Sequence, residues 1–267
     1  MNGFRLPEPT EIVLLSVFLL IHFMTAAPSK IVLLLTGTVD VGAMAFTRLT
    51  DVNQRKQDYL KAIRYYLNRF PYPVVFVENS GNDLAQELMA ELASGRLEVL
   101  TYSGNQYNPE LGKGYGEARS ILHGIHHARS ITEDCFVFKI TGRYSITNAQ
   151  CFFREYETHP ELDLLADLTN NFRWSMSFIV GFRPSFVKKY LAPNSEQIND
   201  TAGFAFEHAL AKSVLEAIGD QVQFRIFRYY PKLEAISGTT GKPYRNAWWY
   251  MWPRQIKYWI RFLIVIR

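Results

Sequence analysis

Short runs of apolar residues alternate along the chain with longer segments in which apolar residues recur at helical spacing. The runs at residues 30–35, 74–77, 97–102 and 135–140 are rich in Val, Ile, Leu and Phe, and each predicts a strand buried on both faces. Residues 54–70, 82–94 and 115–129 carry apolar stripes three and four positions apart, which predicts three helices. This order indicates an α/β fold with a mainly parallel sheet flanked by helices.

The pattern is less regular after residue 144. Residues 162–168, 175–182 and 222–230 predict further strands, and residues 184–191 and 204–218 predict helices. No repeat, low-complexity segment or long linker divides the chain. At 267 residues, we therefore expect one domain over residues 29–244, preceded by an uncertain segment 1–28 and followed by a distinct tail, 245–267.

Residues 1–28 contain an apolar run at positions 12–24 followed by small residues, superficially like a signal peptide. Glu8 and Glu11 outweigh Arg5 ahead of this run, whereas a signal peptide begins with positive charge. The run is also shorter than the roughly 20 residues needed to cross a bilayer. Two interpretations remain open: a helix that touches a membrane, or a chain start assigned too early, with Met24 as the true first residue.

Charge changes the picture at the C-terminus. The chain carries a net charge of +4, yet residues 242–267 hold six basic side chains, no acidic one and four tryptophans. Drawn as a helix, this tail places its basic and apolar residues on opposite faces: Arg254, Lys257 and Arg261 on one, and Ile256, Trp259, Ile260, Leu263 and Ile266 on the other. Residues 245–267 thus predict a helix in the membrane interface, with the basic face toward anionic headgroups. The alternative is a helix packed on the body with a solvated basic face.

Two cysteines, Cys135 and Cys151, are too few for a disulfide framework, and we interpret both as packing residues in a reducing compartment. Nucleic acid is a poor candidate partner because the basic tail is rich in tryptophan and the rest of the chain is slightly acidic. His123 and His127 are four positions apart, but they lie on the face of their helix opposite its apolar stripe, which indicates a solvated face.

Small polar residues and glycines follow each of the first four predicted strands. In an open parallel sheet, ligands bind beyond the carboxyl ends of the strands. Short side chains and free backbone amides at such a rim suit a nucleotide, although the same residue types also make ordinary turns. The candidate rim residues are Thr36, Gly37, Thr38, Glu78, Asn79, Ser80, Gly81, Thr141, Gly142 and Tyr144.

Two glycine-bearing loops extend this candidate site. Lys113, Gly114 and Glu117 belong to the start of the third helix, where Lys113 could meet a phosphate. Ser237, Gly238 and Thr239 belong to a loop that lacks the spacing of a P-loop, and we expect this loop to close on a diphosphate. Either segment could instead be a plain surface loop.

Glu207 is the sharpest candidate for catalysis because it projects into the apolar stripe of the helix at 204–218. A carboxylate there is either desolvated, with a raised pKa that suits a general base, or held by an internal partner. No pair of carboxylates follows the fourth strand, so we assign no metal ligands. Lys139 and Arg143 stand there instead and could neutralise phosphate charge directly.

Taken in order, five motifs resemble those of bacterial GT-A-type glycosyltransferases that build capsule or O-antigen polysaccharide. They are VENSG at 77–81, GKGYGEAR at 112–119, FKITGRY at 138–144, AFEHAL at 205–210 and ISGTTG at 236–241. The resemblance covers about residues 30–244 and implies a GT-A-like, Rossmann-like fold. It implies that residues 78–83 hold the nucleotide base, that Lys113 and Glu117 border the sugar nucleotide, and that Glu207 is the base if the enzyme inverts configuration.

The resemblance also implies an activity: a hexosyltransferase that moves sugar from a nucleotide-sugar donor to a lipid-linked glycan acceptor at the cytoplasmic face of the inner membrane. Lys113, Lys139 or Arg143 would stabilise the leaving diphosphate. Mg²⁺ or Mn²⁺ serves most such enzymes, but residues 139–144 lack their Asp-any-Asp motif. Two alternatives stay open: a sugar nucleotidyltransferase, and a non-catalytic membrane-associated scaffold of a polysaccharide assembly complex.

Overall fold

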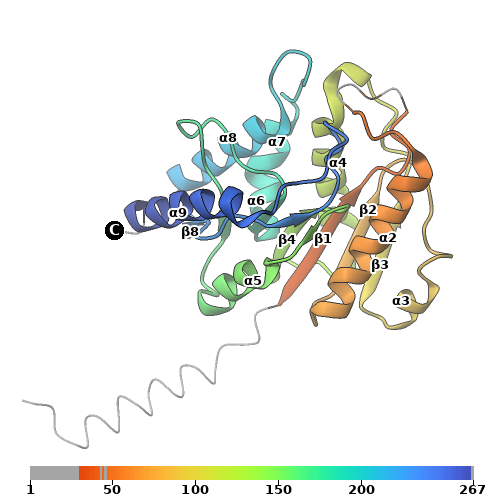
Figure 1. Ribbon diagram of the computed structural model, residues 1–267, viewed down its shortest axis with the longest axis horizontal. Coiled ribbons are helices and arrows are strands. Elements are labelled where there is room, and N and C mark those ends of the chain that lie inside the picture. The colour runs from red at the N-terminus through yellow and green to blue at the C-terminus, as the bar shows by residue number, and fades with distance from the viewer. Residues whose placement is uncertain (1–29, 43, 45–46, 266–267) are drawn as a thin grey trace, which may run out of the picture. The chain divides into compact units, whose positions relative to one another are not determined.

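A computed structural model describes residues 30–42, 44 and 47–265, and the uncertain segment 1–28 lies outside them. A seven-stranded sheet has the order β3-β2-β1-β4-β7-β6-β8, with helices on both faces (Figure 1). Its strands are β1 (Ile31–Gly37), β2 (Val74–Glu78), β3 (Leu97–Thr101), β4 (Phe136–Thr141), β6 (Leu164–Ala166), β7 (Ile179–Phe182) and β8 (Phe224–Ile226). A separate pair joins β5 (Ser145–Ile146) and β9 (Leu233–Glu234).

The described helices differ widely in length. They are α2 (Val52–Arg69), α3 (Met89–Ala93), α4 (Gly112–His127), α5 (Ala149–Thr158), α6 (Pro184–Phe186), α7 (Ala192–Ser195), α8 (Phe206–Gly219) and α9 (Trp248–Val265), with a 3₁₀ turn η1 (Pro109–Leu111) and a π-helical turn η2 (Val187–Leu191).

Strand pairing confirms the predicted fold class. β1 pairs in parallel with β2 and β4, β2 pairs in parallel with β3, and β6 with β8. Only β7 among the strands of this described sheet runs antiparallel to its neighbours, β4 and β6. All seven residues of β1 are buried, as expected for a central strand covered by helices on both faces.

Alternate residues of β1 pack into two separate hydrophobic clusters, one on each face of the sheet. Leu33 and Leu35 pack into a cluster with apolar residues of α2 and α5, whereas Val32 and Leu34 pack into a second cluster with residues of α4 and α8. This division follows from the two-residue period of a strand, which sends successive side chains to opposite faces. The carboxyl ends of β1 and β4 are thereby held in register at one edge of the sheet.

Two helical segments differ from the sequence prediction. Residues 82–94 were expected to form one helix, but only α3 forms there, because the chain turns at 85–88 after the Asp83 side chain accepts the amide of Ala85 at 2.9 Å. α5 was not predicted from the sequence, although its buried residues Phe152, Phe153 and Tyr156 have helical spacing.

The predicted C-terminal helix is present as α9, but part of its basic face is directed toward the protein rather than outward. Arg261 forms an ion pair with the carboxylate of Asp167, which is 1% exposed, and the Arg254 guanidinium lies 3.5 Å from the centroid of the Tyr250 ring. Arg261 turns toward the protein because a buried carboxylate requires a countercharge. Arg254 turns toward the body for another reason, since its guanidinium packs between the rings of Tyr250 and Tyr230. Lys257 is exposed as expected.

The predicted apolar face of the tail is exposed over its described residues. Ile256, Trp259, Ile260 and Leu263 are 38–63% exposed, and Ile266 lies outside the described residues. Within the part of the chain that the structure describes, no helix combines the length and apolarity needed to cross a membrane.

Candidate functional site

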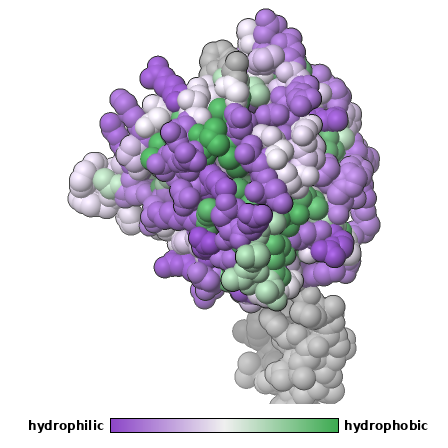
Figure 2. Space-filling model, turned by 90° about the vertical axis from the view of Figure 1, so that its right-hand side faces the viewer, coloured by the Kyte–Doolittle hydropathy of each residue, from purple (hydrophilic) through white to green (hydrophobic). Residues whose placement is uncertain are grey.

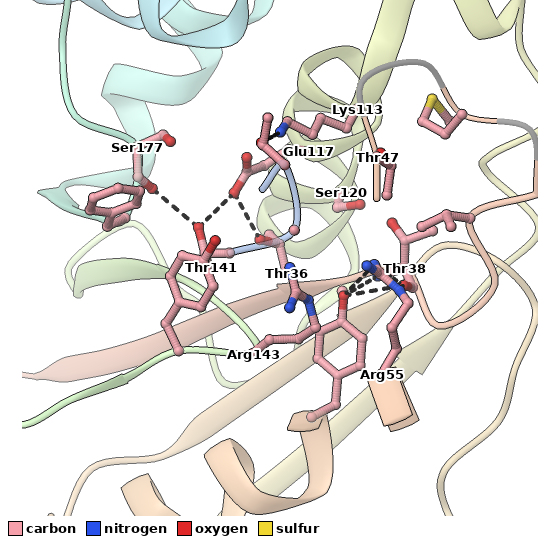
Figure 3. Close-up of a pocket in the computed structure, with 18 of the residues that line it drawn as sticks. Thr36, Thr38, Thr47, Arg55, Lys113, Glu117, Ser120, Thr141, Arg143 and Ser177 are labelled. Atoms are coloured by element: carbon pink, nitrogen blue, oxygen red, sulfur yellow. Dashed lines mark hydrogen bonds between the residues drawn. The ribbon is translucent and has the colours of Figure 1, made fainter. Parts of the chain in front are cut away.

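A pocket opens at the carboxyl ends of β1 and β4, the edge where an open parallel sheet binds ligands (Figure 3). It brings together predicted residues that are distant in sequence. Those that line it are Thr36, Gly37, Thr38, Lys113, Glu117, Thr141, Arg143, Tyr144, Glu207, Gly238 and Thr239.

Gly142 is required by the close approach of β4 to β1 at this edge. Its amide donates to the Thr36 carbonyl at 2.9 Å, and a Cβ atom at residue 142 would lie 2.6 Å from that same oxygen. Gly114 has a similar packing role, because a Cβ there would lie 2.9 Å from the Cβ of Phe206 at the start of α8. These glycines shape the pocket without lining it.

Glu78 lies beneath the rim rather than on the pocket surface. Its carboxylate is fully buried and accepts the amides of Val39 at 2.8 Å, Ser80 at 3.0 Å and Asn82 at 2.9 Å. Burial raises the pKa of Glu78, and these hydrogen bonds oppose the shift. The carboxylate thus fixes the loops that follow β1 and β2.

Four other predicted residues of the rim and of the late loop, which is the loop at residues 237–241, also lie outside the lining. The Ser80 hydroxyl accepts the amide of Asp40 at 3.0 Å. Asn79 is 1% exposed and joins two pocket elements, since its Oδ1 accepts from the Thr38 hydroxyl at 2.7 Å and its Nδ2 donates to the Gly116 carbonyl at 3.3 Å. Gly81 takes a φ of +78° in the turn after β2, which favours glycine. Ser237 accepts the amide of Thr240 at 3.3 Å and so shapes its own loop.

Lys139 is fully buried and paired with Glu117 at the base of the pocket. Its ammonium also donates to the Ser177 carbonyl at 2.6 Å and to the Thr141 hydroxyl at 3.3 Å. Glu117 accepts a further bond from that hydroxyl at 3.1 Å. A buried ammonium needs a countercharge, and Glu117 provides it here. The charge of Lys139 is therefore already neutralised and is not available to a phosphate, in contrast to the prediction from the sequence.

Two of the predicted cationic side chains line the pocket wall beside this pair. Lys113 is exposed and hydrogen-bonded to the Thr239 hydroxyl. Arg143 is largely buried, donates to the Ile236 carbonyl at 3.1 Å and lies 3.8 Å from an oxygen of Asp58. Both are therefore placed to meet an anionic ligand in the pocket.

Arg55 also lines the pocket and was missed in the sequence. Its guanidinium donates to the Thr38 carbonyl at 2.9 Å, to the Leu49 carbonyl at 3.1 Å and to the Tyr59 hydroxyl at 3.2 Å, as Figure 3 shows in part. It thus fixes the segment after β1 and adds positive charge. Arg55 could have been predicted, because it lies four residues before Tyr59 and eight before Ile63 and therefore shares the buried face of α2 with them.

Glu207 lines the same pocket from the first turn of α8. The Ser177 hydroxyl donates to its Oε1 at 2.8 Å, so the carboxylate has an internal partner. Burial raises the pKa of Glu207, and the nearby Glu117 carboxylate raises it further, against the Ser177 hydrogen bond and the charge of Lys139. Glu207 thus has both a raised pKa and an internal partner, which were alternatives in the prediction from the sequence.

The late loop covers one side of the pocket. The Gly238 carbonyl accepts the amides of Arg48 at 2.9 Å and Leu49 at 3.3 Å, which ties this loop to the segment after β1. Gly238 also lies against Arg143, since a Cβ there would be 2.7 Å from its Nη2. The loop therefore contacts two of the cations that line the pocket, Lys113 through Thr239 and Arg143 through Gly238.

The residues at the end of β4 do not fit a divalent metal ion. Lys139 and Arg143 are cations, and the nearby Glu117 is already bound to Lys139. Over the described residues, no three His, Cys, Asp or Glu side chains gather in a way that could hold a metal. A divalent ion prefers several oxygen ligands, preferably carboxylates, which this strand end does not supply.

No family model and no curated protein sequence matches the chain. Among solved structures, it is similar to a protein assigned as a nucleotide-diphospho-sugar transferase from Desulfovibrio desulfuricans G20, with 11% identity, a TM-score of 0.47 and coverage of 74% of this chain and 80% of that one. It is also similar to the inositol-1-phosphate CTP transferase from T. maritima, with 13% identity, a TM-score of 0.43 and coverage of 86% and 97%. Because the sequence identities and TM-scores are this low, the function of this chain has to be inferred from its own residues.

Proposed function

We propose that this protein is a glycosyltransferase that moves a sugar from a nucleotide-sugar donor to a glycan acceptor. The observation that carries the proposal is the position of Glu207, a carboxylate with a raised pKa in a pocket that Lys113 and Arg143 also line. A base and an anion-binding wall in one pocket are what sugar transfer from a diphosphate requires. The order of the five sequence motifs supports the same activity.

In the proposed reaction, Glu207 accepts the proton of the acceptor hydroxyl as that oxygen attacks the anomeric carbon. The bond from this carbon to the diphosphate breaks, and the diphosphate leaves with the electron pair. Lys113 and Arg143 would oppose the developing negative charge. The products are a glycoside of inverted configuration, a nucleoside diphosphate and a proton held on Glu207.

Two neighbouring groups and partial burial prepare Glu207 for this role. The Ser177 hydroxyl fixes one carboxylate oxygen, and the Lys139 ammonium holds the Ser177 carbonyl at 2.6 Å. Partial burial keeps the Glu207 pKa above its ordinary value, which makes its carboxylate a stronger base near neutral pH. No step is assigned to a metal ion.

The same resemblance extends the proposal to surface polysaccharide such as capsule or O-antigen. The acceptor would then be a lipid-linked glycan at the cytoplasmic face of the inner membrane. Lipid-linked acceptors remain at the bilayer, so an enzyme with this acceptor benefits from a surface that binds lipid.

Thermal unfolding with a panel of UDP-, GDP-, CMP- and dTDP-sugars, each with EDTA or manganese, tests the proposal. We expect one nucleotide class to raise the melting temperature, and the shift to survive EDTA. Hydrolysis of that donor by water then provides an assay without a known acceptor. Glu207→Gln should abolish nucleoside diphosphate release and keep the thermal shift, whereas Glu196→Gln, on an exposed side chain, should change neither.

Other outcomes would refute the transferase. Stabilisation by a nucleoside triphosphate, with pyrophosphate released in the presence of a sugar phosphate, would indicate a sugar nucleotidyltransferase. Folded protein that responds to no nucleotide, and is unchanged by Glu207→Gln, would indicate a scaffold without catalysis.

A further inference from the structure

The outward face of α9 is an exposed apolar surface of unusual composition. Four of the protein's five tryptophans lie on this helix, and their exposed fractions run from 38% at Trp259 to 73% at Trp248. Ile260 and Leu263 extend the surface and are 54% and 63% exposed. At 100° per residue, these six side chains share one side of the helix, away from the buried Met251 and Tyr258. We call this set the tryptophan face.

Polar contacts fix the opposite side of the helix to the body. The Tyr258 hydroxyl donates to Asp167 at 2.9 Å, and Arg261 pairs with the same carboxylate. The Gln255 side chain donates to the Arg228 carbonyl at 3.0 Å and accepts the Tyr230 amide at 3.1 Å. These bonds set the rotation of α9 about its axis, so the fold itself holds the tryptophan face outward.

We propose that the tryptophan face binds the surface of an anionic lipid bilayer, with α9 lying in the plane of the interface. Tryptophan is enriched at the boundary between headgroups and acyl chains, where an aromatic ring meets both an apolar and a polar environment. The exposed Lys242, Arg245 and Lys257 flank this surface, and residues 242–267 contain no acidic side chain. Each such cation contributes about 1 kcal/mol beside anionic headgroups.

The arrangement differs from the one expected from the sequence. Arg261 pairs with the buried Asp167 and Arg254 packs against aromatic rings, so binding depends mainly on apolar side chains and less on charge. The side of the molecule around α2 and α3 is covered mostly by hydrophilic side chains, with smaller hydrophobic areas among them (Figures 1 and 2). Outside α9, the exposed large hydrophobic residues of the described chain are scattered, at Val52, Met89, Phe172, Leu215 and Ile218. The tryptophan face is therefore a local feature of α9 rather than a general property of the surface.

The tryptophan face also lies close to the pocket. Tyr244 lines the pocket, and α9 begins at Trp248, four residues later. Four residues of extended chain span at most about 14 Å, so the pocket wall and the start of the lipid-binding helix are near neighbours. A glycan acceptor held on a lipid could thus meet the pocket; this extension rests on the proposed function, whereas lipid binding does not.

Flotation of the full chain with phospholipid vesicles tests the inference. We expect it to float with vesicles of phosphatidylcholine and phosphatidylglycerol, and more weakly with pure phosphatidylcholine. Trp252→Ser combined with Trp259→Ser should lower the partition coefficient about tenfold or more, because apolar area is no longer buried in lipid. Met89→Ser combined with Phe172→Ser removes two exposed apolar side chains elsewhere and should have little effect.

The outcomes separate this inference from its rivals. Wild-type protein that floats with neither vesicle, or a tryptophan variant that floats as well as wild type, overturns it. A concentration-dependent dimer that the tryptophan variant abolishes, without vesicle binding by wild type, would assign the face to a second copy instead. Glu207→Gln should float like wild type, so lipid binding and sugar transfer can fail independently.

Discussion

Replacement of Arg261 by methionine tests whether the buried ion pair with Asp167 stabilises the C-terminal helix. Asp167 is 1% exposed, and without Arg261 its carboxylate keeps the Tyr258 hydroxyl at 2.9 Å as a hydrogen-bond donor. Removal of one partner from a buried pair costs about 3–5 kcal/mol, whereas an exposed pair contributes about 0.2–1 kcal/mol. Because the Arg261 side chain is 17% exposed, we expect a loss near the lower end, about 3 kcal/mol.

Undocking of α9 sets an upper limit on this loss, since it would return Asp167 to water. Burial of Met251 and Tyr258 contributes about 1.5–3 kcal/mol each, so undocking costs about 3–6 kcal/mol. The two free energies are of similar size. Arg261→Met should therefore lower the stability of the protein and also populate a state in which α9 is detached.

Urea unfolding measures the first effect, and hydrogen exchange at the α9 amides measures the second. Lys257→Met removes an exposed cation from the same helix and should change the unfolding free energy by less than about 0.5 kcal/mol. Asp167→Asn added to Arg261→Met should recover much of the loss, because it removes the unpaired charge. If Arg261→Met costs no more than Lys257→Met, the assigned role of the ion pair is wrong.

The pH dependence of the Arg261→Met deficit provides an independent check. Burial raises the pKa of Asp167 from its ordinary value of 3.8, and the charge of Arg261 opposes this shift. Without Arg261, the folded-state pKa rises further, so the folded protein binds a proton that the unfolded chain has lost. The deficit should therefore be large at neutral pH and shrink as the pH falls toward 3.8.

Three further substitutions test other parts of the structure. Tyr66→Phe removes the hydroxyl that bonds the Tyr144 carbonyl at 2.8 Å and the Ile146 amide of β5 at 3.0 Å, and should cost about 2–4 kcal/mol in urea unfolding. Tyr65→Phe changes a partly exposed side chain, removes one hydrogen bond and should cost less. Gly142→Ala forces a methyl group against the backbone of β1 and should cost about 1–3 kcal/mol and weaken donor binding, whereas Gly219→Ala, with free space around it, should be nearly neutral. Glu207→Gln should raise the melting temperature at pH 7, because the raised folded-state pKa of Glu207 makes the wild type less stable as the pH rises above 4.5. The gain over wild type should therefore disappear near pH 4.5. An equal or larger gain at pH 4.5 would contradict the assignment.

The elements of the fold that depend on short-range periodicity could be predicted from the amino-acid pattern alone. The buried run of β1 and the stripes of α2 and α4 could be identified because their period records which faces pack against neighbours. The same reasoning identified Glu207, since a carboxylate on an apolar stripe conflicts with its surroundings. It also placed the small polar residues after each strand at the sheet edge, where most of them line or support the pocket.

The partners of the charged residues, in contrast, depend on contacts between elements that are distant in sequence. Lys139 stands in a strand that its neighbours in sequence identify correctly, yet its ion pair with Glu117 joins residues 22 positions apart. The pair between Arg261 and Asp167 spans 94 positions and turns the arginine of α9 inward. Periodicity reports the direction of a side chain relative to its own element, whereas the energy of a buried charge depends on the groups that folding brings beside it. The sequence therefore determined where the sheet, its flanking helices and its polar edge lie, and the assembled fold decided which of their charges remain available to a ligand or to a lipid surface.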